Sequence, residues 1–237
     1  MTYILVLETA LDVCSVALGK DGALIADKSV SGTNLHASHL TVFIDDVIKA
    51  AGITYKDISA ICISEGPGSY TGLRIGTSAA KGLCFALDIP LLAVNTLQGL
   101  AAGAIKNNAQ LPGNTLLCPM IDARRMEVYY ALYNTDLQEV SPTKAEIVTA
   151  EAFSAVLADN NVCFFGNGMP KSREILSQFP KAFFADDIYT RAENLVALAF
   201  EKFNAQQTEN LYNFEPFYLK EFVAGSPAEK VKKLLNS

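Results

Sequence analysis

Several closely spaced glycines stand in the stretch ISEGPGSYTGLRIGTSAAKG (residues 63–82), between a short apolar run and a helix-like segment. Turns of this kind bind phosphates in two well-known motifs. A phosphate loop has the pattern G-x-x-x-x-G-K-[ST], but the chain contains no Gly-Lys-Ser or Gly-Lys-Thr. A dinucleotide-binding turn has the pattern G-x-G-x-x-G, whereas Gly66, Gly68 and Gly72 follow G-x-G-x-x-x-G. The sequence therefore excludes a phosphate loop and misses the dinucleotide spacing by one residue.

Two interpretations of this stretch stay open. A glycine turn before a helix leaves backbone N–H groups and a positive dipole end that can hold an anion, so Gly66 and Gly68 are candidates for binding a nucleotide. The alternative is packing, because glycine inside a helix costs about 1 kcal/mol relative to alanine and needs a reason. Small residues three and four apart let a second backbone approach closely, either the protein's own or a partner's. This small-residue face comprises Gly72, Gly76, Ala79, Ala80 and Leu83.

Metal-binding and nucleophilic side chains are sparse. His36 and His39 are the only histidines, and a polar helix end explains them without a metal. Neither is near an evident nucleophile, so a Ser/His/Asp or Cys/His apparatus is not predicted. The five cysteines are scattered and form no C-x-x-C pair, which favours reduced, mostly buried thiols in a cytoplasm. We expect no metal site and no catalytic residue of these classes.

Three carboxylates end predicted strands or lie in the turns after them. Glu8, Asp12 and Asp122 would face a cleft if the chain folds into two lobes. In actin-like folds, acidic residues at such turns hold Mg²⁺ or position a water molecule. Acidic side chains also cap tight turns by accepting bonds from nearby backbone amides, and we favour this second interpretation. An actin-fold ATPase or small-molecule kinase that binds Mg-nucleotide in the cleft stays as the alternative function.

Composition limits the classes of protein further. Half of the 237 residues are hydrophobic, 19% are charged and the mean hydropathy is +0.22, yet no apolar run approaches the length of a membrane span. The N-terminal residues read as a strand rather than a secretory signal. A net charge of −6 and a pI near 5.0 argue against the chain binding a nucleic-acid backbone without a partner. The one basic cluster, Lys230, Lys232 and Lys233, is expected to be a solvated tail.

Periodicity predicts the elements that would position these residues. GKDG at residues 19–22 indicates a hairpin, and Leu40, Phe43, Ile44, Val47 and Ala51 recur at helical spacing before Gly52. The predicted strands cover residues 3–8, 13–18, 23–30, 60–64 and 91–94, and the predicted helices cover residues 36–51, 71–88 and 191–204.

The second half of the chain repeats the first. Aligning LETALDVCSVALGKDGAL with IDARRMEVYYALYNTDL places Glu8 opposite Asp122, and ICISEGPG has a counterpart in VCFFGNGM, although the identities are few. A duplicated β-β-β-α-β-α unit is the pattern of actin-like ATPases and sugar kinases, an analogy that speaks to fold more than function. We predict an α/β fold of two actin-like (ASKHA, ribonuclease H-like) lobes.

The predicted domain boundaries follow from composition. The polar stretch KNNAQLPGN (residues 106–114) separates a first lobe, residues 1–107, from a smaller second lobe, residues 108–190. Residues 191–237 would form a C-terminal helix and tail that pack back toward the first lobe.

Longer segments resemble one family over nearly the whole chain. They are ILVLETALDVCSVAL, SEGPGSYTGLRIGTSAAKGL, PLLAVNTLQGLA, MIDARRMEVYYALY and EPFYLKEF. Together they resemble the TsaB (YeaZ) family of bacterial tRNA threonylcarbamoyladenosine (t6A) biosynthesis. The resemblance implies two actin-like lobes and a cytoplasmic role in a pathway that modifies adenosine 37 of tRNAs reading ANN codons. It also implies that the paralogue TsaD is the transferase and that TsaE is an ATPase partner.

The chain departs from TsaD-like sequences where those carry metal ligands. The H-x-x-x-H of TsaD-like proteins corresponds to VNTLQGLA here, with Thr96 and Leu100 at the ligand positions. An acidic pair near the N-terminus is reduced to Asp12, which is followed by Val13. These changes imply a non-catalytic subunit without a cofactor or a metal. They also leave the M22 glycoprotease-like label, and hence a metallopeptidase, without chemical support.

The resemblance implies that this subunit docks TsaD through first-lobe helices and forms a homodimer when TsaD is absent. Contact with tRNA is expected only through the complex. A Gly76→Leu variant is expected to block association while leaving the monomer folded. The predicted interface residues are Leu40, Phe43, Ile44, Val47, Gly72, Ile75, Gly76, Ala79, Ala80 and Leu83.

Overall fold

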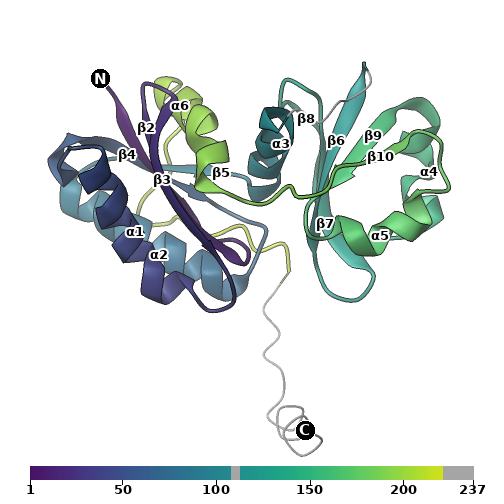
Figure 1. Ribbon diagram of the computed structural model, residues 1–237, viewed down its shortest axis with the longest axis horizontal. Coiled ribbons are helices and arrows are strands. Elements are labelled where there is room, and N and C mark those ends of the chain that lie inside the picture. Colours follow the sequence, from purple (N-terminus) through teal and green to yellow (C-terminus); the bar gives the residue numbers. More distant parts are fainter. Residues whose placement is uncertain (108–112, 221–237) are drawn as a thin grey trace, which may run out of the picture.

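Two five-stranded sheets lie side by side in the computed structural model, which describes residues 1–107 and 113–220 (Figure 1). In the first sheet the strand order is β3-β2-β1-β4-β5, and in the second it is β8-β7-β6-β9-β10. In both, the first three strands pair antiparallel and the last two add parallel to the first. The second sheet therefore repeats the topology of the first, and the predicted fold class of two actin-like lobes is confirmed.

The elements follow this duplicated order along the chain. The first sheet contains β1 (Tyr3–Glu8), β2 (Val13–Lys20), β3 (Ala23–Ser31), β4 (Ile58–Ser64) and β5 (Leu91–Val94), with helices α1 (His36–Ala50), α2 (Tyr70–Leu87) and α3 (Thr96–Lys106). The second contains β6 (Thr115–Asp122), β7 (Glu127–Tyr133), β8 (Glu139–Ile147), β9 (Asn161–Phe165) and β10 (Ala182–Phe184), with α4 (Ala150–Asp159) and α5 (Met169–Leu176). Helix α6 (Val196–Asn204) follows a short 3₁₀ helix (Ala192–Leu195), and another (Tyr55–Asp57) precedes β4.

Helix α3 was not predicted. Gly99 and Gly103 lower its helix propensity. Tertiary packing overrides that propensity, because a Cβ atom at Gly99 would lie 2.5 Å from Leu195, and one at Gly103 would meet Asn194. The two glycines let the segment before α6 lie directly against α3. No helix within residues 1–107 and 113–220 is long and apolar enough to cross a membrane.

The first sheet is covered on both faces. Leu5 and Leu7 of β1 point to a core shared with α1 and α2, whereas Ile4 and Val6 point to a core shared with α6. Helix α3 packs instead on the second sheet, where Leu97 and other residues join the core of β6, β7 and β9. Figure 1 shows α3 between the two sheets and α6 over the first.

The predicted domain boundaries stay predictions, although the packing of α6 on the first sheet agrees with a returning C-terminal helix. Residues 108–112 of the predicted linker and the basic cluster at Lys230, Lys232 and Lys233 lie outside the described residues. After α6 the chain runs back along the first lobe to Lys220. We call residues 209–220 the strap.

Candidate functional site

A cleft of about 620 Å³ opens between the two lobes. It is lined by the β1–β2 turn, the start of α2, the β6–β7 turn and the end of the strap. The side chains of Asp12, Tyr70, Asp122, Arg124 and Lys220 line this cleft, together with Gly68. Of the five proposed cofactor-binding positions, the structure brings Asp12, Gly68 and Asp122 to the cleft and leaves Glu8 and Gly66 outside its lining.

Glu8 lies beneath the cleft rather than in it. Its side chain is 1% exposed, and its Oε1 atom accepts bonds from the amide of Ala10 (2.6 Å) and the hydroxyl of Ser64 (2.8 Å). Burial raises the pKa of Glu8 to about 7, against the lowering effect of these hydrogen bonds. The carboxyl group therefore ties the turn after β1 to the end of β4, which fits the turn-capping interpretation.

The raised pKa of Glu8 predicts a pH dependence of stability. A carboxyl group whose pKa is higher in the folded than in the unfolded protein favours the fold while it is protonated. Its contribution to the free energy of unfolding is largest at pH values below its unfolded pKa. This contribution is lost as the pH rises through 7. We expect the wild-type protein to lose on the order of 3 kcal/mol of unfolding free energy between pH 4.5 and pH 8 relative to a Glu8→Gln variant. Urea unfolding at several pH values checks this, and parallel pH profiles for the two proteins would contradict it.

Asp122 is engaged within the second lobe. Its Oδ1 atom accepts a bond from the amide of Arg124 (2.8 Å) and forms an ion pair with Lys171 of α5, while its own amide donates to Asn167 Oδ1 (2.9 Å). Partial burial raises the pKa of Asp122, but the bonds from Lys171 and Arg124 outweigh burial and hold it below its usual value. The bond to Arg124 is again that of a turn cap.

The arrangement around the carboxylates gives little support to a Mg-nucleotide site. Among residues 1–107 and 113–220, no three His, Cys, Asp or Glu side chains are grouped so that they could hold a metal ion. Of the three proposed carboxylates, Glu8 is buried and Asp122 is paired with Lys171, whereas Asp12 is exposed.

His36 and His39 lie at the start of α1 and point to different surroundings. His36 is buried, and burial lowers its pKa against the raising effects of a bond to the backbone of Leu11 and the charge of Asp12. His39 Nδ1 lies 3.1 Å from the carbonyl oxygen of Leu35. Both positions fit the interpretation of a polar helix end.

The glycine turn after β4 is occupied by the protein's own groups. The amide of Gly66 donates to Thr96 Oγ1 (3.1 Å), and the amide of Ser69 donates to the carbonyl oxygen of Ala10 (2.6 Å). Gly66 has φ +118°, and a Cβ atom there would lie 2.6 Å from the carbonyl oxygen of Phe217 in the strap. These two amides are therefore not available to an anion in this arrangement.

Thr96 and Leu100, at the ligand positions of TsaD-like sequences, are structural. Besides accepting the bond from Gly66, Thr96 donates its own amide to Gly66 O (2.9 Å) and is fully buried. Leu100 is 1% exposed and packs in the core between α3 and the second sheet.

Gly72 and Gly76, the first two residues of the small-residue face of α2, pack against the β1–β2 turn. A Cβ atom at Gly68 would clash with the carbonyl oxygen of Ala10, and Cβ atoms at Gly72 and Gly76 would clash with the carbonyl oxygen and the hydroxyl of Thr9. The neighbour that requires these glycines is the protein's own turn. The protein's own turn therefore explains Gly72 and Gly76 without a partner, their predicted interface role stays a prediction, and a Gly76→Leu variant cannot leave the monomer undisturbed.

Several other predicted interface residues belong to the core. An amphipathic helix turns its apolar stripe toward its own sheet, and four of the ten predicted positions lie on such stripes. These four are Leu40, Ile44, Val47 and Ala80, each 2% exposed or less, so the core of the first lobe accounts for them and their predicted role in a partner contact stays a prediction. The remaining four, Phe43, Ile75, Ala79 and Leu83, are half-buried and pack against that core.

Two exposed apolar residues on these helices were missed. Val42 of α1 is 53% exposed and Phe85 of α2 is 72% exposed. Their signal in the sequence is an apolar residue outside the apolar stripe of its helix, where a polar one is expected. We call these two residues, together with Phe43, Ile75, Ala79 and Leu83, the α1–α2 patch.

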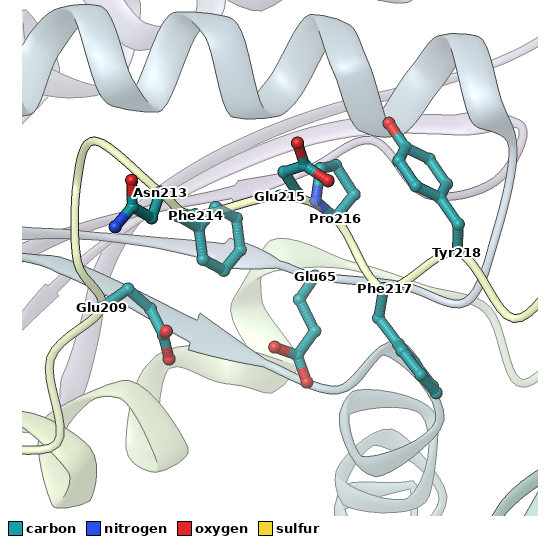
Figure 2. A pocket seen from close by; sticks show the side chains of 8 residues that line it. All are labelled: Glu65, Glu209, Asn213, Phe214, Glu215, Pro216, Phe217 and Tyr218. Atoms are coloured by element: carbon teal, nitrogen blue, oxygen red, sulfur yellow. The ribbon is translucent and has the colours of Figure 1, made fainter.

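A second hollow, of about 570 Å³, lies under the strap at the end of β4 (Figure 2). Figure 2 shows the side chains of Glu65 and Glu209 facing the same space, with Phe217 on the other side of Glu65. Burial raises the pKa of Glu65; Lys202 opposes this rise and Glu209 adds to it.

Comparisons with known proteins agree with this fold. A family model described as TsaD, tRNA N6-adenosine threonylcarbamoyltransferase, matches residues 31–227. A crystal structure from Pseudomonas aeruginosa, described as similar to peptidase YeaZ, superposes with a TM-score of 0.79 at 27% identity and covers 93% of this chain and 100% of that one. A structure titled YeaZ from Pseudomonas aeruginosa gives a TM-score of 0.74 at 27% identity, covering 92% and 100%.

Two curated relatives carry the name tRNA threonylcarbamoyladenosine biosynthesis protein TsaB. That of Escherichia coli is 38% identical over 56% of this chain and 55% of its own length, so the match spans about half of that relative. That of Bacillus subtilis is 31% identical over 73% of this chain and 74% of its own length. With the family model matching most of its residues, the chain belongs to the TsaB (YeaZ) family of tRNA threonylcarbamoyladenosine biosynthesis proteins.

Proposed function

We propose that this protein is a non-catalytic partner of the TsaD transferase in t6A modification of tRNA, in the cytoplasm, with the TsaE ATPase as a further partner. The observation that carries the proposal is the replacement of both TsaD-like metal-ligand positions by buried, structurally engaged residues. Thr96 binds the glycine turn and Leu100 fills the core, so neither side chain faces the cleft as a ligand. The names of the relatives from Escherichia coli and Bacillus subtilis support the pathway.

The α1–α2 patch is the surface that we propose for docking TsaD. Exposed apolar groups that cluster on one face are typical of protein–protein contact sites, and large aromatic side chains such as Phe85 dominate their energetics. Val42 and Phe85 lie on neighbouring helices that contact each other, and half-buried Ala79 and Leu83 lie on α2. The same surface would serve the homodimer when TsaD is absent, and tRNA would be reached only through the complex.

Removing the protein from its own cells is expected to abolish t6A in bulk tRNA, because a non-catalytic partner that TsaD requires cannot be replaced by TsaD alone. Mass spectrometry of tRNA nucleosides measures the loss. Re-expression of the wild-type chain should restore t6A, and a Thr96→Ser variant, which keeps the hydroxyl that binds Gly66, should restore it equally. Unchanged t6A after removal would overturn the pathway assignment, and transfer of the threonylcarbamoyl group by the purified chain alone would overturn the non-catalytic role.

A further inference from the structure

The first half of the strap is firmly attached to the first lobe. Glu209 pairs with Leu91 at the edge of β5, with its amide donating to Leu91 O at 2.9 Å. Lys81 of α2 donates to the carbonyl oxygens of Tyr212 and Phe214, each at 3.2 Å. The Phe214 side chain is 9% exposed and belongs to the core of the first sheet. Residues 209–214 are therefore held by burial as well as by hydrogen bonds.

The second half of the strap, residues 215–220, makes fewer hydrogen bonds to the first lobe than the first half does, although Pro216 is buried. The amide of Phe217 donates to Glu65 O at 2.7 Å, and the ring of Tyr218 lies 5.0 Å from that of Tyr70. The side chains of Phe217 and Tyr218 are 38% and 36% exposed. Such contacts open at a lower free energy than the buried ones of residues 209–214.

This second half also joins the two lobes. Lys220 forms an ion pair with Glu127 at the start of β7 in the second lobe. Residues 217–220 line the interlobe cleft together with the turns that carry Asp12 and Asp122. Detaching residues 215–220 would therefore uncover both the glycine turn at Gly66 and this part of the cleft.

We propose that residues 215–220 are a releasable latch that closes the interlobe cleft and holds the two lobes at one spacing. Residues 209–214 serve as its fixed hinge end. The latch is closed by the Lys220–Glu127 ion pair, the bond from Phe217 to Glu65 and the contact between Tyr218 and Tyr70. An ion pair at the surface, here between the 47% exposed Lys220 and the partly buried Glu127, contributes little free energy, so the latch can open without unfolding either lobe.

Charge reversal tests the latch. A Lys220→Glu variant faces Glu127 with a like charge, and we expect the amide of Phe217 to exchange with solvent about three- to tenfold faster. The amide of Phe214, which donates to Asn210 O at 2.8 Å within the fixed half, should keep its rate. Amide hydrogen exchange of the full chain, read by NMR, measures both. The double variant Lys220→Glu, Glu127→Lys should restore the wild-type rate at Phe217.

A Lys106→Glu variant is the matched control, because it reverses another exposed ion pair, to Glu193, away from the strap. It should leave the Phe217 rate unchanged. An unchanged rate in the Lys220→Glu variant overturns the proposal. So does equal acceleration at Phe214, failure of the double variant to restore the rate, or the same acceleration in the Lys106→Glu control.

A distance measurement tests the effect on the lobes. All five native cysteines are buried, so spin labels attach selectively to cysteines introduced at the exposed positions Lys56 in the first lobe and Glu174 in the second. The distance distribution between these labels should broaden in the Lys220→Glu variant and return to wild-type width in the double variant. A distribution that does not change would overturn the role of the latch in setting lobe spacing.

Discussion

Replacing Gly72 with alanine is expected to lower the free energy of unfolding by about 1 to 3 kcal/mol, although alanine is the better helix former. The added methyl group would overlap the carbonyl oxygen of Thr9, a backbone atom in the β1–β2 turn that is buried beneath α2. The turn or the helix must shift to make room. Urea unfolding at constant pH measures the change.

Gly82 provides the control in the same helix. A Cβ atom there meets nothing within 4 Å, so Gly82→Ala should stabilise the protein by about 0.5 to 1 kcal/mol. If Gly72→Ala were as stable as Gly82→Ala, the packing account of the small-residue face would be wrong. Because a Cβ atom at Gly76 would meet the Thr9 hydroxyl, loss of TsaD binding in a Gly76→Leu variant would report damage to the fold rather than a lost contact.

Placing a charge in the α1–α2 patch is expected to disrupt association with TsaD. A Phe85→Asp variant removes a large exposed ring from the proposed contact and should weaken binding about 30-fold or more, the range of interface hot spots. A Val42→Asp variant should weaken it about tenfold, because the side chain is smaller. Neither residue contributes to the core, so both variants should unfold at the wild-type temperature. Calorimetric titration with purified TsaD measures the affinity.

Val140 supplies a matched control, since it is 55% exposed on β8 of the second lobe and Val42 is 53% exposed. A Val140→Asp variant should bind TsaD as tightly as the wild-type protein. Wild-type affinity in the Phe85→Asp variant, or equal losses in the Val42→Asp and Val140→Asp variants, would remove the α1–α2 patch as the docking surface. The latch would be unaffected by that result, because none of its contacts involves the patch.

The strands and the first-lobe helices follow closely from sequence patterns. Predicted strands 3–8 and 91–94 match β1 and β5, and the GKDG turn joins β2 to β3. The two lobes also match at the aligned positions. Asp122 ends β6 as Glu8 ends β1. Gly166 follows β9 as Gly66 follows β4, and both glycines have positive φ. Local periodicity and turn chemistry carry this information because they depend on residues that are close in the chain.

The direction of a helix face does not follow from periodicity. The stripe of Leu40, Ile44 and Val47 shows that one side of α1 is apolar. The same pattern is expected whether that side packs on the protein's own sheet or on a partner protein. The strap is a second example. Nothing near Glu65 in the sequence indicates that Phe217 binds its carbonyl group, since that contact depends on the path of the whole chain. The cleft-lining positions Asp12, Gly68 and Asp122 could be predicted because each lies at the end of a strand of the duplicated unit or in the turn after it.

The exchange of helices between the sheets has a consequence for how the chain folds during synthesis. Helix α3 is encoded in the first half of the chain yet covers the second sheet, and α6 is encoded after the second sheet yet covers the first. When the first five strands have left the ribosome, the sheet face formed by Ile4, Val6 and Val94 therefore lacks its main cover until residues 192–204 are made. Domains usually complete in order from the N-terminus. Here the second lobe has all its elements, α3 included, by residue 184, whereas the first lobe waits for α6, so we expect the second lobe to become resistant to proteases before the first.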